Sequence, residues 1–259
     1  MEATIGSGRS VRGRVALVTG AASGMGAATV AVFAADGARV AACDIDGDGA
    51  GRVARDARDA GGDAEAFAVD LADGEQIGDL VGRVTARFGR LDILVNNAGI
   101  SVRCPIDAPD YDDRWAQGLA VLLSAQQRLI RAALPWLRRS DAARIVNIAS
   151  TEALGATAGL SVYSAAKAGV TGLSRSLAVE LGRDAITVNC ICPGPIETAM
   201  TAAISAEHKA VFARRRTALG RYGRPEEVAH ITLSLCLPAA SYLTGAVIPV
   251  DGGLMARNA

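Results

Sequence analysis

"TGAASGMG", residues 19–26, comes straight after a short apolar run and leads into a segment with helical periodicity, residues 27–35. Gly20 permits a tight turn out of a strand, Gly24 lets the backbone approach a pyrophosphate, and Gly26 lets a helix sit close to a sheet. The N–H groups at the start of that helix would then face the phosphates. Many strand-to-helix turns carry glycine for steric reasons alone, so a plain turn stays open as an alternative.

Apolar runs of strand length recur along the chain, separated by longer segments of helical periodicity. This alternation predicts a parallel sheet covered by helices on both faces, because the runs are too continuously apolar for one exposed face. Right-handed crossovers make an open, doubly wound α/β sheet of the Rossmann type the simplest topology, with ligands bound at the carboxyl ends of the strands. The predicted strands lie within residues 14–20, 38–44, 64–70, 91–99, 144–150, 186–194 and 245–253.

No linker, internal repeat or low-complexity tract divides the 259 residues. We therefore predict a flexible N-terminal arm at residues 1–12 and a single Rossmann-type domain at 13–259. The arm lacks the apolar region of a secretory signal. The uncharged run 231–250 is interrupted by Pro238, Gly245 and Pro249, so we predict no membrane span and a cytoplasmic protein.

Charge and residue usage exclude several classes of function. Lys plus Arg and Asp plus Glu number 27 each, so no net field attracts nucleic acid or an anionic membrane. An odd number of cysteines, five, argues against a disulfide framework, and the C-x-C of Cys190 and Cys192 is interpreted as core filler. With only His208 and His230 as histidines, we predict no metal site and no His-based triad. The expected partner is a small molecule.

An acidic residue closes the second predicted strand about twenty residues beyond the glycine loop. At this place Asp44 can accept hydrogen bonds from an adenosine ribose, and it would repel a 2'-phosphate. Neither Ser23 in the loop nor Ile45 after the acid supplies the positive charge that a 2'-phosphate would need. The sequence therefore favours NAD over NADP. The alternative is a solvated acid that begins the polar turn "DIDGDG", residues 44–49.

Two further strand ends fit a bound dinucleotide. Asp70 follows the third predicted strand, where it can meet the adenine. "NNAG", residues 96–99, follows the fourth, where Asn96 and Gly99 can meet the adjoining ribose. Because "NNAG" also fits an ordinary turn, these residues support the dinucleotide prediction without deciding it.

"YSAAK", residues 163–167, places a phenol and an ammonium one helical turn apart. A free phenol has a pKa of about 10 and is a poor base near neutrality, but an adjacent cation stabilises the phenolate. We therefore predict that Tyr163 is a general acid/base, that Lys167 lowers its pKa, and that Lys167 also holds ribose hydroxyls. An isolated Y-x-x-x-K also fits an ordinary helix pair.

Taken in order, "TGAASGMG", "NNAG" and "YSAAK" resemble the short-chain dehydrogenase/reductase family over nearly all of the chain. The resemblance implies a catalytic serine thirteen residues before the tyrosine, at Ser150, which polarises the substrate oxygen. It also implies a segment "CPGPIETAM", residues 192–200, over the nicotinamide, and a frequent tetrameric assembly, so we expect a homo-oligomer, tetramer or dimer. The variable stretch 199–223 is expected to be a helical substrate lid, with the arginines at 214–216 on its solvated face.

Motifs and resemblance together predict the residues of the cofactor site. They are Gly20, Ser23, Gly24, Met25, Gly26, Asp44, Asp70, Leu71, Asn97, Ala98, Gly99, Tyr163, Lys167, Pro193, Gly194, Ile196 and Thr198.

One position departs from the family pattern. Where relatives usually read "LAVNL", with an asparagine that steadies a water beside the lysine, this chain reads "LAVLL" and has Leu122. Leu122 cannot bind that water, so proton exchange with solvent is expected to be rerouted or slowed. Gln126, one turn further on the same helix face, is a candidate for restoring the polar contact, the alternative being an exposed or core-edge amide.

The sequence thus predicts an NAD-dependent oxidoreductase that interconverts a secondary alcohol and a ketone through Ser150, Tyr163 and Lys167. An NADPH-dependent ketoreductase and a dinucleotide-binding regulator or pseudoenzyme are the alternatives. The expected substrate walls, residues 100–111, 151–160 and 199–223, are mixed in character and leave the substrate class open.

Overall fold

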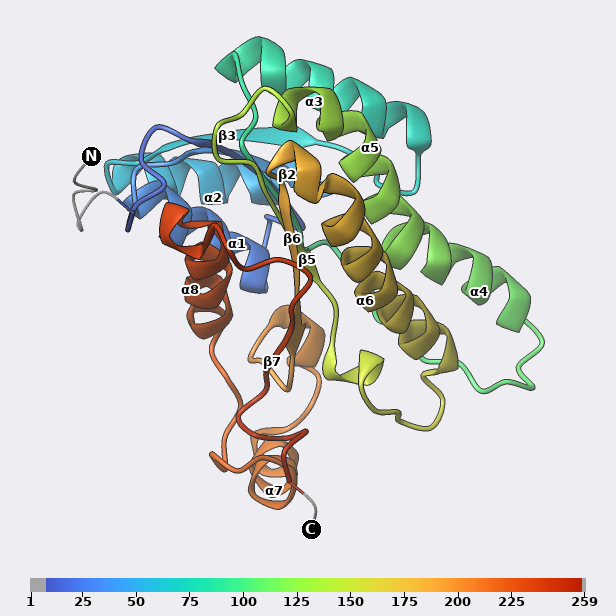
Figure 1. The fold of residues 1–259 in the computed structure, drawn as a ribbon. Helices are drawn as coiled ribbons and strands as arrows, with labels where there is room; N and C mark the ends of the chain where they lie inside the picture. The colour runs from blue at the N-terminus through green and yellow to red at the C-terminus, as the bar shows by residue number, and fades with distance from the viewer. Residues whose placement is uncertain (1–7, 258–259) are drawn as a thin grey trace.

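Seven parallel strands form one sheet in the computed structural model, which describes residues 8–257 (Figure 1). The strand order is β3-β2-β1-β4-β5-β6-β7, and every neighbouring pair is parallel. The predicted doubly wound α/β fold and all seven predicted strands are confirmed. The strands are β1 Val15–Thr19, β2 Arg39–Asp44, β3 Asp63–Ala68, β4 Ile93–Asn96, β5 Arg144–Ile148, β6 Thr187–Pro193 and β7 Val247–Val250.

Helices cover both faces of the sheet, as Figure 1 shows. Alternate strand residues supply the two apolar layers: Val15 and Leu17 of β1 face one, Ala16 and Val18 the other. This double burial explains why the strands are apolar throughout. One face carries α1 Gly24–Ala35, α2 Gly47–Asp59 and α8 Pro225–Cys236, and the other carries α3 Gly74–Phe88, α5 Ala125–Leu137 and α6 Ser161–Leu181.

Shorter helices lie outside these layers and shape the carboxyl edge of the sheet. Helix α4, Tyr111–Leu119, continues through a π-helical turn, η1 Ala120–Ser124, into α5. The predicted lid holds a 3₁₀ turn, η4 Ala199–Thr201, and helix α7 Ala206–Arg216, and its arginines at 214–216 are exposed. An isolated bridge between Ile196 and Gly223 joins the two ends of the lid. The remaining 3₁₀ turns are η2 Thr151–Ala153, η3 Gly182–Asp184 and η5 Pro238–Ala240.

The predicted N-terminal arm is only partly described, because residues 1–7 lie outside the described residues. Residues 8–12 pack on the domain. Val11 is buried, and its N–H donates to the Asp36 carboxylate at 2.6 Å, while the Ser10 hydroxyl donates to the same carboxylate at 3.0 Å. These bonds to the C-terminal end of α1 attach the chain to the domain before residue 13.

The strand order reverses between β1 and β4. The chain runs outward from β1 through β2 to β3, then returns to lay β4 on the other side of β1. Val18 is level with Val95, so the chain leaves both strands at the same height and places Gly20 beside Asn97. Such a switch point is where open α/β sheets bind ligands.

A buried carboxylate holds together the opposite, amino edge of the sheet. Asp92 accepts hydrogen bonds from Val15 N at 2.8 Å, Arg90 Nη2 at 2.7 Å and Ser140 Oγ at 2.5 Å. Its side chain is fully buried, whereas that of Asp141, which pairs with Arg90 and Arg14, is 73% exposed. Asp92 therefore joins the starts of β1 and β4.

Replacing Asp92 by alanine is expected to lower the free energy of unfolding by about 3–5 kcal/mol, because the buried donors around it lose their partner. Asp141→Ala, which removes an exposed carboxylate from the same arginines, is expected to change it by less than about 1 kcal/mol. Urea unfolding followed by circular dichroism measures both. Equal losses in the two variants would contradict the role given to Asp92.

Candidate active site

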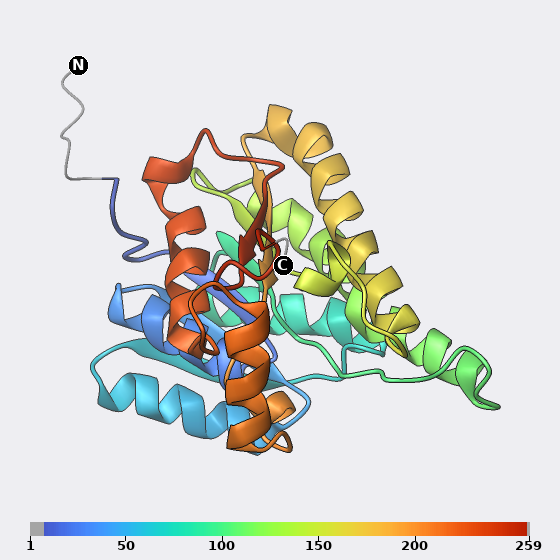
Figure 2. The same cartoon turned by 90° about the horizontal axis from the view of Figure 1, so that it is seen from below.

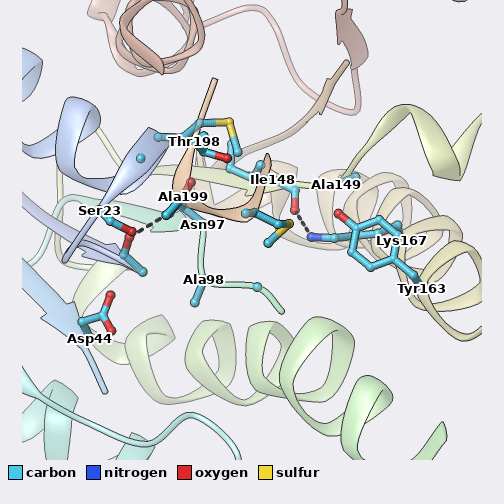
Figure 3. A pocket seen from close by; sticks show the side chains of 15 residues that line it. Ser23, Asp44, Asn97, Ala98, Ile148, Ala149, Tyr163, Lys167, Thr198 and Ala199 are labelled. Carbon is cyan, nitrogen blue, oxygen red and sulfur yellow. Dashed lines mark hydrogen bonds between the residues drawn. The ribbon is translucent and has the colours of Figure 1, made fainter. Parts of the chain in front are cut away.

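A cavity of about 270 Å³ opens at the switch point, on the carboxyl edge of the sheet (Figure 3). Its walls come from the ends of β1, β2, β4 and β5, from α6, and from the start of the lid. The predicted residues that line it are Gly20, Ser23, Gly24, Met25, Asp44, Asn97, Ala98, Gly99, Tyr163, Lys167 and Thr198. Ala199 and Met200, from the predicted segment 192–200 and lid 199–223, also line it, and Ile148 and Ala149, which the sequence did not predict, complete the wall.

The three glycines of the loop are required by close contacts. Gly20 has a φ of +66°, and a Cβ there would lie 2.8 Å from the Ala98 Cα. A Cβ on Gly26 would lie 1.9 Å from the Gly20 carbonyl oxygen, and one on Gly24, φ +54°, would lie 3.2 Å from Thr198 Cγ2. Glycine is the residue that these positions accept. The loop thus presents bare backbone at the start of α1, which fits the pyrophosphate of a dinucleotide.

Asn97 ties this loop to β4. Its Nδ2 donates to the Thr19 carbonyl at 2.8 Å and to the Gly20 carbonyl at 3.3 Å. The Thr19 hydroxyl accepts from the N–H groups of Asn97 and Ala98, each at 3.0 Å. Asn97 therefore lines the cavity and also fixes its floor.

Asn96, predicted to meet the ribose, points away from the cavity, so that prediction is wrong. The Asn96 side chain is buried, and its Nδ2 donates to Asn147 Oδ1 at 2.8 Å. Asn147 donates in turn to Ser174 Oγ of α6 at 2.9 Å. Successive strand residues point to opposite faces of the sheet. Asn96, the last residue of β4, points to the face that α6 covers.

Asp44 lines the cavity and braces two turns beside it. Its Oδ2 accepts from Ala22 N in the glycine loop at 2.9 Å, and its Oδ1 accepts from Asp46 N at 3.0 Å. Arg52 of α2 lies near the same turn and pairs with Asp46 at 3.7 Å. The carboxylate therefore places negative charge at the end of the cavity that β2 forms.

Several predicted cofactor residues lie outside the wall. Asp70 caps its own turn by accepting from Ala72 N at 2.8 Å, and the Leu71 side chain belongs to the apolar core. Gly194 packs against the backbone of Asp251, where a Cβ would lie 2.7 Å from the Asp251 Cα. The remaining ones are Gly26, Pro193 and Ile196. Of the predicted segment 192–200, Thr198, Ala199 and Met200 reach the cavity.

Tyr163 and Lys167 enter the cavity from the same face of α6, as Figure 3 shows. Lys167 is 3% exposed, and its Nζ donates to the Ile148 carbonyl at the end of β5 at 2.8 Å. The Nζ lies 5.7 Å from the centre of the Tyr163 ring. Ser150 follows β5, does not line the cavity, and accepts from Glu152 N at 3.1 Å.

Burial controls the ionisation of this pair. It raises the pKa of Tyr163 above its ordinary value, the Ser150 hydroxyl opposes this by hydrogen bonding, and the Glu152 charge adds to it. Burial also lowers the pKa of Lys167 to about 8. The protein alone therefore does not lower the tyrosine pKa as the sequence led us to expect, because loss of hydration outweighs the neighbouring groups.

The helix position of Leu122 is fully buried beside this pair. A Cβ on Gly99 would lie 3.4 Å from Leu122 Cδ2 and 3.8 Å from Lys167 Nζ, so the leucine fills the space next to the ammonium. Gln126 is also buried rather than exposed. Its Nε2 donates to the Leu122 carbonyl in the π-helical turn at 3.1 Å, and its Oε1 has no hydrogen-bond partner among the described residues.

The other wall residues have identifiable causes. Ile148 contributes its carbonyl, which any residue would supply, so no side-chain signal marks it. Ala149 follows it on the same strand end. Ala199 and Met200 sit directly after Thr198, where the 3₁₀ turn η4 folds the chain back over the glycine loop. Both residues lie within the predicted segment 192–200 and within the predicted lid 199–223.

Comparison with known proteins identifies the family. A family model described as enoyl-(acyl carrier protein) reductase matches residues 20–255. The chain is 37% identical over 245 residues to the 3-oxoacyl-(acyl-carrier-protein) reductase FabG of Thermotoga maritima, covering 95% of this chain and 99% of that protein. It is 40% identical over 250 residues to the cis-4-hydroxycyclohexanecarboxylate dehydrogenase of Sinomonas cyclohexanicum, with coverage of 96% and 99%. The chain belongs to the short-chain dehydrogenase/reductase family.

Solved structures agree with this membership. A putative NAD(P)-dependent gluconate 5-dehydrogenase from Beutenbergia cavernae, which has NADP bound at low occupancy, gives a TM-score of 0.90 at 38% identity over 96% of this chain and 100% of that one. A short-chain dehydrogenase/reductase from Serratia marcescens gives 0.88 at 35% identity, with coverage of 94% and 98%. The protein is thus an oxidoreductase of a family that uses nicotinamide dinucleotides.

Between residues 8 and 257, no three His, Cys, Asp or Glu side chains are grouped so that they could hold a metal ion. In the same part of the chain, no helix combines the length and the apolar character that crossing a membrane requires.

Lys167→Met is expected to raise the free energy of unfolding at pH 7 by on the order of 3 kcal/mol, because folding lowers the lysine pKa from 10.5 to about 8. Between these values the unfolded chain binds more protons than the folded one, so wild-type stability should rise with pH. The methionine variant should lack that rise. Urea unfolding at pH 7 to 10 measures it.

Lys209→Met is the matched control, since it removes the lysine that pairs with Glu197 outside the cavity. It should keep the rise of stability with pH. A Lys167→Met curve that runs parallel to wild type over this range would show that the ammonium is not buried.

Proposed function

We propose that the protein is an NAD-dependent dehydrogenase that interconverts a secondary alcohol and a ketone, with Ser150, Tyr163 and Lys167 as its catalytic residues. The observation that carries the proposal is the buried Lys167 ammonium beside Tyr163, both facing the cavity behind the glycine loop. A buried cation without a carboxylate partner costs stability, and chemistry at this place is a reason to keep it. Its oxidoreductase relatives support the reaction class.

The cofactor site is assigned to the residues that fit a dinucleotide. Gly20, Gly24 and Gly26 leave room for the pyrophosphate, and the Asp44 carboxylate is placed to accept hydrogen bonds from the adenosine ribose. Ser23, Met25, Asn97, Ala98 and Gly99 would line the remaining wall, and Thr198 would cover it. Asp70, Leu71, Pro193, Gly194 and Ile196 are proposed as backbone or flanking contacts. When bound, NAD⁺ would accept the hydride and add a positive charge to this cavity.

Tyr163 would hold the transferred proton. Its phenol oxygen accepts the proton of the substrate hydroxyl in oxidation and returns it in reduction. The Lys167 ammonium, fixed by the Ile148 carbonyl, stabilises the phenolate form, and the Ser150 hydroxyl acts in the same direction. Because burial raises the Tyr163 pKa in the free protein, we infer that the base becomes effective only in the loaded site.

Location and assembly are part of the same proposal. All five cysteines are buried and unpaired in the described residues, which suits a reducing compartment such as the cytoplasm. We propose a homo-oligomer, tetramer or dimer, on the family resemblance. We propose no nucleic-acid or membrane partner.

Tyr163→Phe should lower kcat for alcohol oxidation by roughly 10³-fold, because the variant has no group to take the proton. Affinity for NADH, measured by fluorescence titration, should stay within about twofold, since the ring is kept. Oxidation is followed at 340 nm with NAD and a panel of secondary alcohols.

Tyr242→Phe is the control for this experiment, because the Tyr242 side chain is fully exposed on the loop before β7. It should retain near wild-type turnover. Activity that survives in Tyr163→Phe would remove the proposed base. Tight NAD binding without turnover of any alcohol would favour a regulator.

The cofactor preference is tested at Asp44, since the Beutenbergia cavernae relative carries NADP and an NADPH-dependent reductase is the second candidate. We expect wild type to favour NAD over NADP by roughly 100-fold in kcat/KM, because the carboxylate repels a 2'-phosphate. Asp44→Asn, which keeps an acceptor for Ala22 N or Asp46 N, should shrink that ratio at least tenfold. A wild-type preference for NADP would overturn the assignment.

A further inference from the structure

Exposed apolar side chains lie on the cavity wall, on the loop that follows Ser150 and on the C-terminal turn that contacts this loop. Met200 lines the cavity together with Tyr163 and Lys167 and is 55% exposed. Leu154, four residues beyond Ser150, is 42% exposed, and Met255 near the end of the chain is 37% exposed. Large apolar groups left in solvent beside a reacting site suggest that something apolar covers them.

The C-terminal turn lies against the loop that follows Ser150. A Cβ on Gly155 would lie 3.4 Å from Met255 Cε. Figure 2 shows the dark red turn after β7 between the lid and the loop after β5. The Asp251 carboxylate holds this turn, accepting from Gly253 N and Met255 N at 2.8 Å each. Met255 and Leu154 therefore belong to one fixed surface.

The far end of the lid closes onto the same turn. Leu219 N donates to the Gly252 carbonyl at 3.0 Å, and a Cβ on Gly253 would lie 2.7 Å from the Ala218 Cβ. Leu219 is itself exposed. The lid thus brings an apolar residue to this surface at each of its ends, Met200 and Leu219.

The Glu152 carboxylate, on the same loop as Leu154, already accepts two hydrogen bonds. Glu152 Oε1 accepts from the Thr157 hydroxyl at 2.7 Å, and its Oε2 accepts from the Ser164 hydroxyl at 3.2 Å. Its two oxygens therefore accept hydrogen bonds from hydroxyl groups of its own loop and of α6. Arg103, on the loop after β4, is exposed and packs its stem within 3.8 Å of a Cβ on Gly159. Its guanidinium would favour a substrate that carries a carboxylate over an uncharged one.

From this arrangement we infer that the substrate is a secondary alcohol with an apolar carbon skeleton, alicyclic or aliphatic, rather than a polyol. The inference rests on the proposed function and adds the substrate class to it. Met200, Leu154 and Met255 would cover the skeleton while its carbinol faces Tyr163. Methionine side chains adapt to different shapes, so several ring and chain sizes should be accepted.

The test compares kcat/KM with NAD for cyclohexanol, threitol and cis-4-hydroxycyclohexanecarboxylate. We expect cyclohexanol to exceed threitol by about tenfold or more, the discrimination that an apolar wall provides. A preference for threitol overturns the inference. A kcat/KM for cis-4-hydroxycyclohexanecarboxylate that exceeds the value for cyclohexanol by about tenfold or more also overturns it. That result would indicate that Arg103 binds the substrate carboxylate.

Leu154→Ser and Met255→Ser test the wall itself. Each should lower kcat/KM for cyclohexanol about fivefold, leave threitol unchanged, and leave the KM for NAD within about twofold. Val179→Ser is the control, since it removes an exposed apolar side chain from α6 about 24 Å from Tyr163. Unchanged substrate ratios in both test variants overturn the inference. Absence of NADH formation with every alcohol would instead count against the proposed function.

Discussion

The joint between the ends of β1 and β4 is the constraint on which the site depends. From β1 and from β4 the chain continues toward opposite edges of the sheet. The Thr19 hydroxyl nevertheless joins the two strand ends, because it accepts hydrogen bonds from two backbone N–H groups of the chain after β4. The Asn97 amide closes the joint from the other side by binding the Thr19 and Gly20 carbonyls. With this joint in place, Gly20 and Gly26 can meet at distances that exclude any side chain. The cavity floor is therefore backbone, held by one hydroxyl and one amide.

The second constraint is the burial of an ammonium on α6. Lys167 lies under the end of β5, where the Ile148 carbonyl accepts a hydrogen bond from its Nζ, and no carboxylate between residues 8 and 257 pairs with it. The charge therefore acts on what enters the cavity rather than on a salt bridge. Leu122 packs beside it and excludes solvent from that side. This environment explains why burial dominates both pKa values, and why the phenol of Tyr163 is a weaker acid in the free protein than its position beside a cation suggests.

Sequence patterns predicted the backbone of this protein well and its side-chain environments less well. Continuous apolar runs predicted all seven strands, and the glycines of the loop predicted positions where a Cβ does not fit. Both patterns can be recognised from a few neighbouring residues of the sequence. Asn96 and Asn97 were harder, since neighbouring strand residues point to opposite faces and only the register of β4 assigns them. Likewise, the burial of Gln126 depends on packing between α5 and the sheet. The direction in which the Tyr163 pKa shifts depends on how much water the folded protein removes from the phenol.

The two halves of the site differ in how the chain builds them, and this explains where prediction from sequence stops. The cofactor half uses strand ends, whose order the fold dictates and whose glycines and acid are written in short motifs. The substrate half joins the loop after Ser150, both ends of the lid and the C-terminal turn, which meet through contacts such as Met255 against Gly155. These segments are separated by tens of residues, and of them only the start of the lid, residues 199–200, lies within a predicted motif. Their apolar character at the cavity mouth becomes visible only once the lid and the C-terminal turn are placed together, so the substrate class has to be argued from the assembled surface.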